Sequence, residues 1–126
     1  MTDPAPSLFV YGTLMSGHSR AGMVPTSARR PAKTRGRLFR LPAGYPALVT
    51  GGGAWVYGEI VEIDDARLLA LLDHYEGTDE GLFRRVRLPV VLGLRSQVAW
   101  TYVMDHPERL GGVPIESGRW RPLRAR

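Results

Sequence analysis

The chain of 126 residues has no cysteine, which excludes disulfides, a cysteine nucleophile and thiolate-held metals. Its length and its 44% hydrophobic content suit one core, so we expect residues 1–126 to form a single domain. The net charge of +5 would suit an anionic partner, but the arginines are scattered along the sequence, and we expect no nucleic-acid partner.

Neither a membrane segment nor a signal peptide is expected. No apolar run reaches the ~18 residues that a membrane-spanning helix needs. Residues 1–7 have no basic start followed by an apolar stretch. Together with the lack of cysteine, these features favour a cytoplasmic protein, and they leave its oligomeric state open.

The first half of the chain predicts strands separated by turns. Glycine and proline are abundant, at 15 and 10 residues, which favours short strands over a helical bundle. Residues 7–14 open with an apolar run that Gly12 stops, so they predict a buried strand that leads into a tight turn. The same pattern predicts strands at 32–41 and 54–63, a loop at 43–47 and a turn at 51–53. Gly58, inside the third strand, is typical of a bulge or a close backbone approach.

One main helix is predicted over residues 64–75. Asp64 is a suitable N-cap, and Asp65 complements the positive end of the helix dipole. Gly77 follows at a position where helices commonly end. The face expected to pack on the core consists of Leu68, Leu71, Leu72 and Tyr75.

Two further strands are predicted at 84–94 and 98–104, where apolar side chains recur at every second position. A turn at residues 95–96 would join them into an antiparallel hairpin. A strand-rich chain with one main helix predicts an α+β fold with a twisted or closed sheet.

Several familiar kinds of site are excluded by the residues present. The histidines His18, His74 and His106 are far apart and match no metal-binding spacing, so no metal is expected. No Gly-x-Ser-x-Gly segment offers a serine nucleophile, and the glycines at 51–53 lack the Lys-Ser/Thr of a phosphate loop.

Two segments remain as candidates for chemistry. The strand that ends at Tyr11-Gly12-Thr13-Leu14 would present backbone N–H groups outside the ladder, and such groups can bind a carboxylate or an oxyanion. Glu76 follows the predicted helix, where exposed carbonyls are expected to raise its pKa and make it a better base near neutral pH. Each segment alone equally suits a structural role, as a strand end or as a solvated Glu at a frayed helix end.

In combination, these segments resemble the gamma-glutamylcyclotransferase-like family, which includes AIG2-like proteins. The similarity extends over nearly the whole chain. The matching segments are Phe9-Val10-Tyr11-Gly12-Thr13-Leu14, Tyr45-Pro46-Ala47-Leu48, Val56-Tyr57-Gly58-Glu59, Leu72-Asp73-His74-Tyr75-Glu76-Gly77, Phe83-Arg84-Arg85 and Ser117-Gly118-Arg119-Trp120. The chain departs from the usual family pattern at Gly17-His18-Ser19-Arg20, at Phe83 and at Arg119.

The resemblance implies a small, partly closed mixed β-barrel with one main helix and short helices packed on it. It also implies an enzyme that converts a gamma-glutamyl amine or amino acid to 5-oxoproline and a free amine, without a metal or cofactor. Glu76 would be the catalytic acid/base, and the backbone of Tyr11, Gly12, Thr13 and Leu14 would hold the α-carboxylate of the small-molecule substrate. Tyr102 and Arg85 are further candidates for substrate contact.

Alternatives remain open at this point. A related enzyme could remove a gamma-glutamyl group from an amine metabolite or from a modified protein side chain. A non-catalytic barrel could instead bind a small molecule or a nucleic acid. Tyr11 and Tyr102 also suit a core, Arg85 also suits solvent, and Trp120 is expected to pack the C-terminal segment onto the barrel. The identity of the leaving amine is not specified.

Overall fold

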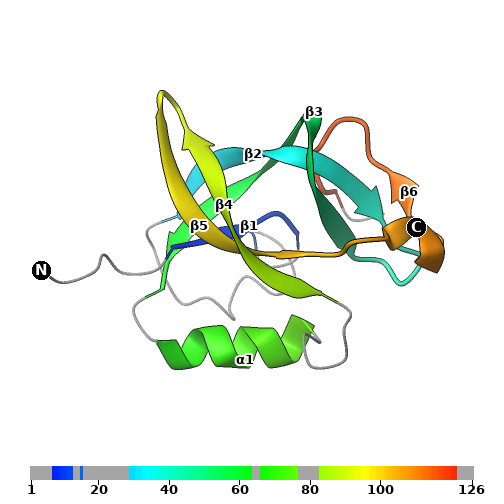
Figure 1. Cartoon of the computed structure of the whole chain (residues 1–126), viewed down its shortest axis with the longest axis horizontal. Helices are drawn as coiled ribbons and strands as arrows, with labels where there is room; N and C mark the ends of the chain where they lie inside the picture. Colours follow the sequence, from blue (N-terminus) through cyan, green and yellow to red (C-terminus); the bar gives the residue numbers. More distant parts are fainter. Residues whose placement is uncertain (1–6, 13–14, 16–28, 64–65, 77–82, 122–126) are drawn as a thin grey trace, which may run out of the picture.

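The computed structural model describes residues 7–12, 15, 29–63, 66–76 and 83–121, and at residues 66, 75 and 76 it describes the backbone alone. In chain order its elements are β1 (Ser7–Val10), β2 (Arg29–Arg40), β3 (Pro46–Glu62), α1 (Ala66–Glu76), β4 (Arg84–Leu92), β5 (Arg95–Val103), the 3-10 helix η3 (Pro107–Leu110) and β6 (Val113–Pro114). The strands curve around one another, and α1 lies along one side of them (Figure 1).

Five strands close into a mixed β-barrel. Their order is β3-β1-β5-β4-β2, and β2 pairs back onto β3 to complete the ring. The β1–β5 pair is parallel and the other pairs are antiparallel. The short strand β6 pairs with the end of β2 outside the ring. The predicted α+β fold, a small barrel with one main helix, is confirmed.

Strand β3 is longer than predicted because it contains two segments that were expected to be irregular. It begins at Pro46 and continues through the glycines at 51–53. Its pairing with β2 skips residues 51–54, which therefore bulge out of the ladder. Gly51 and Gly52 have φ angles of 93° and 89°, a conformation that favours glycine. The prediction of a turn between two strands is wrong here, since the glycines bend one continuous strand.

Gly58 marks a close approach between β3 and β1, as its position in the predicted strand indicates. A Cβ atom at this residue would collide with the carbonyl oxygen of Val10 and would lie 2.9 Å from Cζ of Phe9. A residue without a side chain therefore lets β1 pack tightly against β3.

Strands β4 and β5 form the predicted hairpin, but their turn lies earlier in the chain. Leu92 pairs with Arg95, so the loop consists of Gly93 and Leu94, and the predicted turn at 95–96 is wrong. Gly93 has a φ angle of 59°. A positive φ at the first loop position is what a two-residue hairpin of type II′ requires, and glycine adopts it readily.

The buried side chains form two clusters. The cluster inside the barrel consists of Phe9, Tyr11, Ala32, Leu38, Leu48, Val56, Ile60, Val90, Ala99, Val103 and Trp120. The cluster between the barrel and α1 consists of Leu8, Val10, Leu41, Ala47, Val61, Ile63, Leu69, Leu72, Phe83, Tyr102 and Met104. Side chains alternate along β1, so this strand contributes to both clusters. The expected packing of Trp120 on the barrel is confirmed.

The face of α1 that packs on the barrel agrees with the prediction at Leu68 and Leu72, differs from it at Leu71, and includes Leu69, which was not predicted. Leu69 and Leu72 are 8% and 0% exposed, whereas Leu71 is 55% exposed. Because Leu69 and Leu72 lie one turn apart, they form the stripe that contacts β1 and β5, and the prediction is wrong at Leu71. Asp64 and Asp65, the predicted N-terminal residues, and Gly77 lie outside the described residues. In the described ranges, no helix has the length and apolar character to cross a membrane.

Candidate functional site

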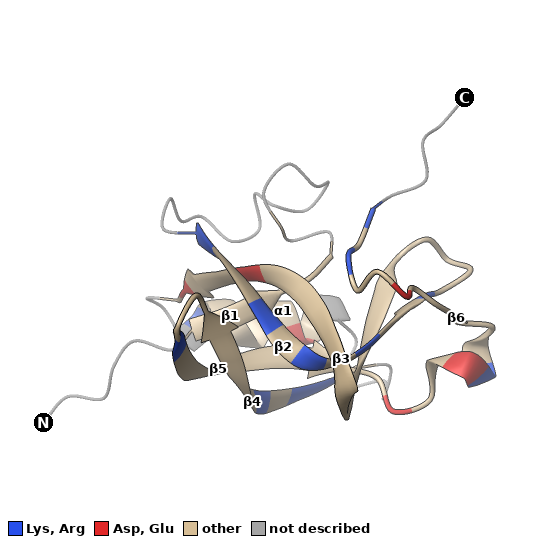
Figure 2. Ribbon diagram, turned by 90° about the horizontal axis from the view of Figure 1, so that it is seen from above, with Lys and Arg blue, Asp and Glu red and all other residues tan. Residues whose placement is uncertain are grey.

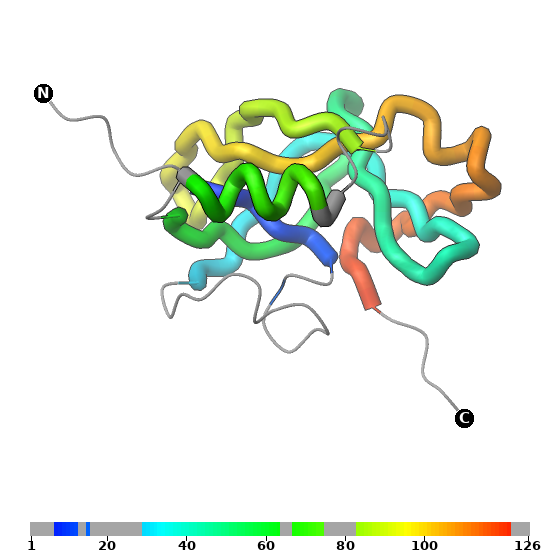
Figure 3. Tube along the Cα trace, turned by 90° about the horizontal axis from the view of Figure 1, so that it is seen from below, coloured from blue at the N-terminus to red at the C-terminus, as the bar shows by residue number. Residues whose placement is uncertain are grey.

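The end of β1 and the end of α1 lie at the same side of the molecule (Figures 1 and 3). The chain leaves the ladder of β1 after Val10 and enters the segment predicted to bind a carboxylate. The helix ends at Glu76, the predicted catalytic acid/base. The fold therefore brings the end of β1 and the end of α1 to one end of the barrel.

The hydroxyl group of Tyr11 anchors the chain at the point where it leaves β1. The side chain is 7% exposed and belongs to the cluster inside the barrel. Its hydroxyl donates to the carbonyl oxygen of Tyr102 at 2.6 Å and accepts from the backbone N–H of Leu48 at 3.3 Å. Tyr11 thereby fixes the start of the following turn against two other strands.

Gly12 opens this turn, and the N–H of Met15 donates to its carbonyl oxygen at 3.0 Å. A Cβ atom at Gly12 would lie 2.6 Å from Cγ and 3.0 Å from Cδ of Pro46. Close packing on Pro46 is thus one reason for glycine here, beside the expected approach of a ligand. Thr13 and Leu14, the other residues predicted to hold the carboxylate, lie outside the described residues.

Glu76 follows Asp73 by three residues and Leu69 by seven along α1. Residues with this spacing lie along one side of an α-helix. Leu69 is buried in the cluster between α1 and the barrel, which identifies this side as the one that packs on the barrel. The backbone of α1 therefore ends at position 76 in line with Leu69 and Asp73, on the side of the molecule where the chain leaves β1 (Figures 1 and 3).

Asp73 links the helix to two strands. Its Oδ1 atom accepts a hydrogen bond from the hydroxyl of Tyr102 at 2.7 Å and another from Nε of Arg85 at 2.8 Å. Tyr102 is 4% exposed, and its hydroxyl also lies 3.5 Å from the carbonyl oxygen of Leu69. The guanidinium group of Arg85 lies over the ring of Trp100, 4.4 Å from its centroid. Arg85 is therefore half-buried in a polar cluster instead of being fully solvated.

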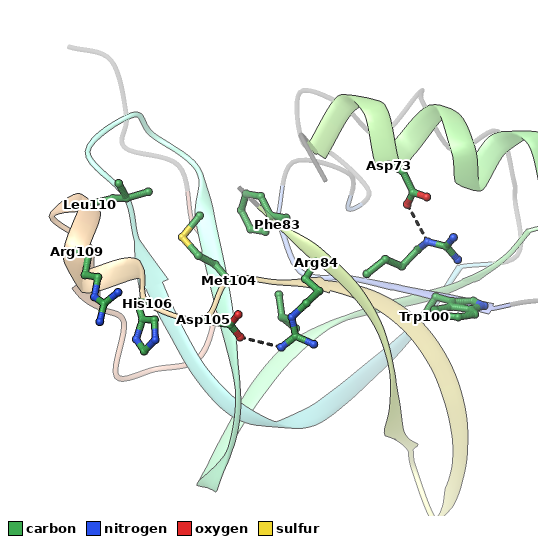
Figure 4. A pocket seen from close by; sticks show the side chains of 11 residues that line it. Asp73, Phe83, Arg84, Trp100, Met104, Asp105, His106, Arg109 and Leu110 are labelled. Carbon is green, nitrogen blue, oxygen red and sulfur yellow. Dashed lines mark hydrogen bonds and ion pairs between the residues drawn. The ribbon is translucent and has the colours of Figure 1, made fainter. Parts of the chain in front are cut away.

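A groove of about 750 Å³ extends from this cluster along the barrel (Figure 4). Asp73, Arg85 and Trp100 line it beneath α1, and Arg109 and Leu110 of η3 line its other end. Between these ends it is lined by Phe83, Arg84, Val103, Met104, Asp105 and His106. Because Phe83 also packs in the cluster that contains Leu69 and Leu72, the groove begins next to α1.

The ionic contacts along the groove differ in their exposure. In the pair of Arg85 and Asp73, both side chains are 26% exposed, whereas those of Arg84 and Asp105 are 59% and 61% exposed. The hydrogen bond from Arg84 lowers the pKa of the Asp105 carboxyl below its ordinary value and raises the pKa of Arg84. His106 Nδ1 lies 3.4 Å from Oε1 of Glu108. The pKa of Glu108 is lowered, first by a hydrogen bond from its own backbone N–H.

Within the described part of the chain, no three His, Cys, Asp or Glu side chains gather as a set that could hold a metal ion. The polar groups that line the groove are guanidinium groups, carboxylates and the imidazole of His106. They can orient a polar small molecule through hydrogen bonds and charge.

In the polar cluster of Asp73, Tyr102 and Arg85, Asp73 is the member to which the sequence analysis assigned no role. A signal for it exists, because Asp73 lies four residues after Leu69, on the same side of the helix. A carboxylate at the edge of an apolar stripe needs a polar partner, and here Tyr102 and Arg85 provide it.

Residues 8–122 match the family model described as gamma-glutamyl cyclotransferase, AIG2-like. The chain belongs to this family. The resemblance inferred from the motifs is therefore confirmed, and the match covers every described element except the first residue of β1.

Two curated relatives are named as cyclotransferases. The chain is 33% identical to the gamma-glutamylaminecyclotransferase of Bos taurus over 102 residues. This alignment covers 71% of this chain and 59% of that protein. It is 32% identical to the gamma-L-glutamyl-butirosin B gamma-glutamyl cyclotransferase of Niallia circulans over 111 residues. This alignment covers 83% of this chain and 70% of that protein.

Solved structures share the fold. The structure of YkqA from Bacillus subtilis superposes with a TM-score of 0.74 at 26% identity, over 93% of this chain and 40% of that one. An AIG2-like protein from Mus musculus superposes with a TM-score of 0.71 at 25% identity, over 98% of this chain and all of that one.

Proposed function

We propose that this protein is an enzyme that cyclises the gamma-glutamyl group of an amide to 5-oxoproline and releases a free amine. The observation that carries the proposal is the convergence of the end of α1, at Glu76, with the turn that begins at Gly12. The two curated relatives, named for gamma-glutamyl cyclotransfer, support the same reaction class.

The reaction requires a base, a means of holding the substrate, and no external nucleophile. Glu76 takes a proton from the α-ammonium group, and the resulting amine attacks the γ-carbonyl carbon to close a five-membered lactam. As the bond from this carbon to the leaving nitrogen breaks, the ring nitrogen loses a second proton. Glu76 passes the two protons in turn to the leaving nitrogen, so the amine departs as an ammonium ion. Because nucleophile and electrophile belong to one molecule, holding them in contact removes much of the entropic barrier.

The backbone of the Tyr11–Leu14 segment is proposed to hold the α-carboxylate. Tyr11 supports this role because its buried hydroxyl bonds to the backbone of Tyr102 and Leu48, which fixes the start of the segment. Tyr102 and Arg85 share Asp73 as their acceptor, so we assign them to the polar wall beside the reacting group.

The test measures 5-oxoproline release from a panel of gamma-glutamyl amides. Glu76→Gln should retain the thermal midpoint and lower the rate by about 10²–10⁴, because it removes the general acid/base and keeps nearly the same shape. Glu116→Gln is a matched control, since it makes the same change at an exposed carboxylate that does not line the groove. Activity of Glu76→Gln within tenfold of the parent rate would overturn the assignment.

The alternative, a barrel that binds nucleic acid, is less well supported than the enzyme, although the molecule has a basic surface. Figure 2 shows Lys and Arg along β2 and β4. The aromatic rings on this surface already carry cations of the same chain. Arg35 lies 3.6 Å from the ring centroid of Trp55, and Arg119 lies 4.0 Å from that of Tyr57. These ring faces are covered, so bases would have to displace arginines before stacking on them.

A further inference from the structure

The groove beside α1 differs in charge from one end to the other. It holds three arginines and two aspartates, Asp73 and Asp105. Each aspartate is already paired, with Arg85 and Arg84 respectively. Arg109, at the far end on η3, makes no ion pair within the part of the chain that the structure describes. The lining side chains therefore carry an excess of one positive charge, that of Arg109 at the end distant from α1. The exposed Glu108 beside it lies outside the lining and interacts electrostatically with Arg109.

Between the two ends, three apolar residues line the groove beside the polar side chains of Arg84, Asp105 and His106. Phe83, Val103 and Met104 are 5%, 2% and 6% exposed, and all three belong to the buried clusters. Such a surface suits a hydrocarbon chain, because apolar burial is favourable and the side chains are already fixed by their packing. Leu110 adds a further apolar side chain beside Arg109.

We propose that this groove receives the leaving-amine part of the substrate and favours an amine whose far end carries a carboxylate. The inference rests on the proposed function, because it assumes that the γ-carbonyl lies near Glu76 at the end of α1. From there the leaving group extends along Phe83 and Met104 toward η3 (Figure 4). Arg109 attracts a terminal carboxylate at this position and repels a terminal ammonium.

The proposal is tested with three gamma-glutamyl amides that share a six-carbon chain and differ in terminal charge. The amines are hexylamine, with a neutral end, ε-aminocaproic acid, with a carboxylate, and hexamethylenediamine, with an ammonium. The readout is kcat/KM for 5-oxoproline release. Because Arg109 is exposed, we expect the carboxylate substrate to be preferred over the neutral one by about fivefold, which corresponds to ~1 kcal/mol.

Variants of Arg109 assign this preference to one side chain. Arg109→Ala should abolish it, and Arg109→Glu should reverse it in favour of the ammonium substrate. Arg95→Ala is the matched control, because it lowers the net charge equally but lies at the start of β5 and does not line the groove. The preference of this control should equal that of the parent.

The possible failures can be distinguished. Equal rates on the three amides, or a carboxylate preference that persists in Arg109→Ala, would overturn this inference and leave the proposed function intact. Release of 5-oxoproline from none of the amides, with the protein folded by thermal unfolding, would overturn the proposed function and this inference with it. A loss of preference in Arg95→Ala as large as in Arg109→Ala would show a general charge effect and would also overturn the assignment.

Discussion

Asp73→Ala should destabilise the protein far more than Asp105→Ala, although both carboxylates bond to an arginine at 2.8 Å. Asp73 also accepts the hydroxyl of Tyr102, which is 4% exposed. Its truncation removes this acceptor from the buried hydroxyl and removes the ion-pair partner of a half-buried guanidinium. Together these losses should cost about 2–3 kcal/mol.

Calorimetric unfolding of the two variants measures this difference. For a chain of this length, 1 kcal/mol corresponds to a midpoint shift of about 4 °C, so Asp73→Ala should lower the midpoint by about 8–12 °C. Asp105→Ala should change it by less than about 2 °C, because its pair with Arg84 is exposed.

A further variant separates the two hydrogen bonds of Asp73. Tyr102→Phe removes the hydroxyl alone and should cost about 1–2 kcal/mol. The double variant with Asp73→Ala should lose less stability than the sum of the single changes, since both remove one shared bond. If Asp73→Ala lowers the midpoint no more than Asp105→Ala does, the reasoning about this cluster is refuted.

Three other predictions concern the barrel and its edges. Gly58→Ala should lower the unfolding free energy by at least about 2 kcal/mol, because its Cβ would meet the β1 backbone, and a normal calorimetric midpoint would contradict this close packing. Gly12→Ala should destabilise the chain through contact with Pro46, and adding Pro46→Ala should restore the midpoint; a ligand role for Gly12 then predicts that the double variant still binds 5-oxoproline more weakly than Pro46→Ala alone. The pKa of Asp105, measured by NMR titration, should lie below its ordinary value and should return toward that value in Arg84→Ala. Any stabilisation from this pair is therefore present at pH values above the ordinary pKa of an aspartate, and it is lost as the pH falls through the lowered pKa of Asp105.

The sequence by itself determined the main elements and the position of the candidate site. Alternation of apolar residues predicts β4 and β5, and the end of an apolar run at Gly12 predicts the end of β1, because side-chain periodicity depends only on local backbone geometry. The motifs around Gly12 and Glu76 were sufficient to indicate the family, since their order along the chain is a property of the sequence.

Features that depend on contacts between distant residues were decided by the tertiary structure. The leucines at 68, 69, 71 and 72 permit more than one apolar stripe, and packing on β1 and β5 selected the one containing Leu69 and Leu72. Pairing with β2 likewise made the glycines at 51–53 a bulge, because a strand can continue past residues that its partner skips. Asp73 acquired its role only when the fold brought Tyr102 and Arg85 to it from β5 and β4, and no local pattern specifies a hydrogen bond between elements so far apart in the chain.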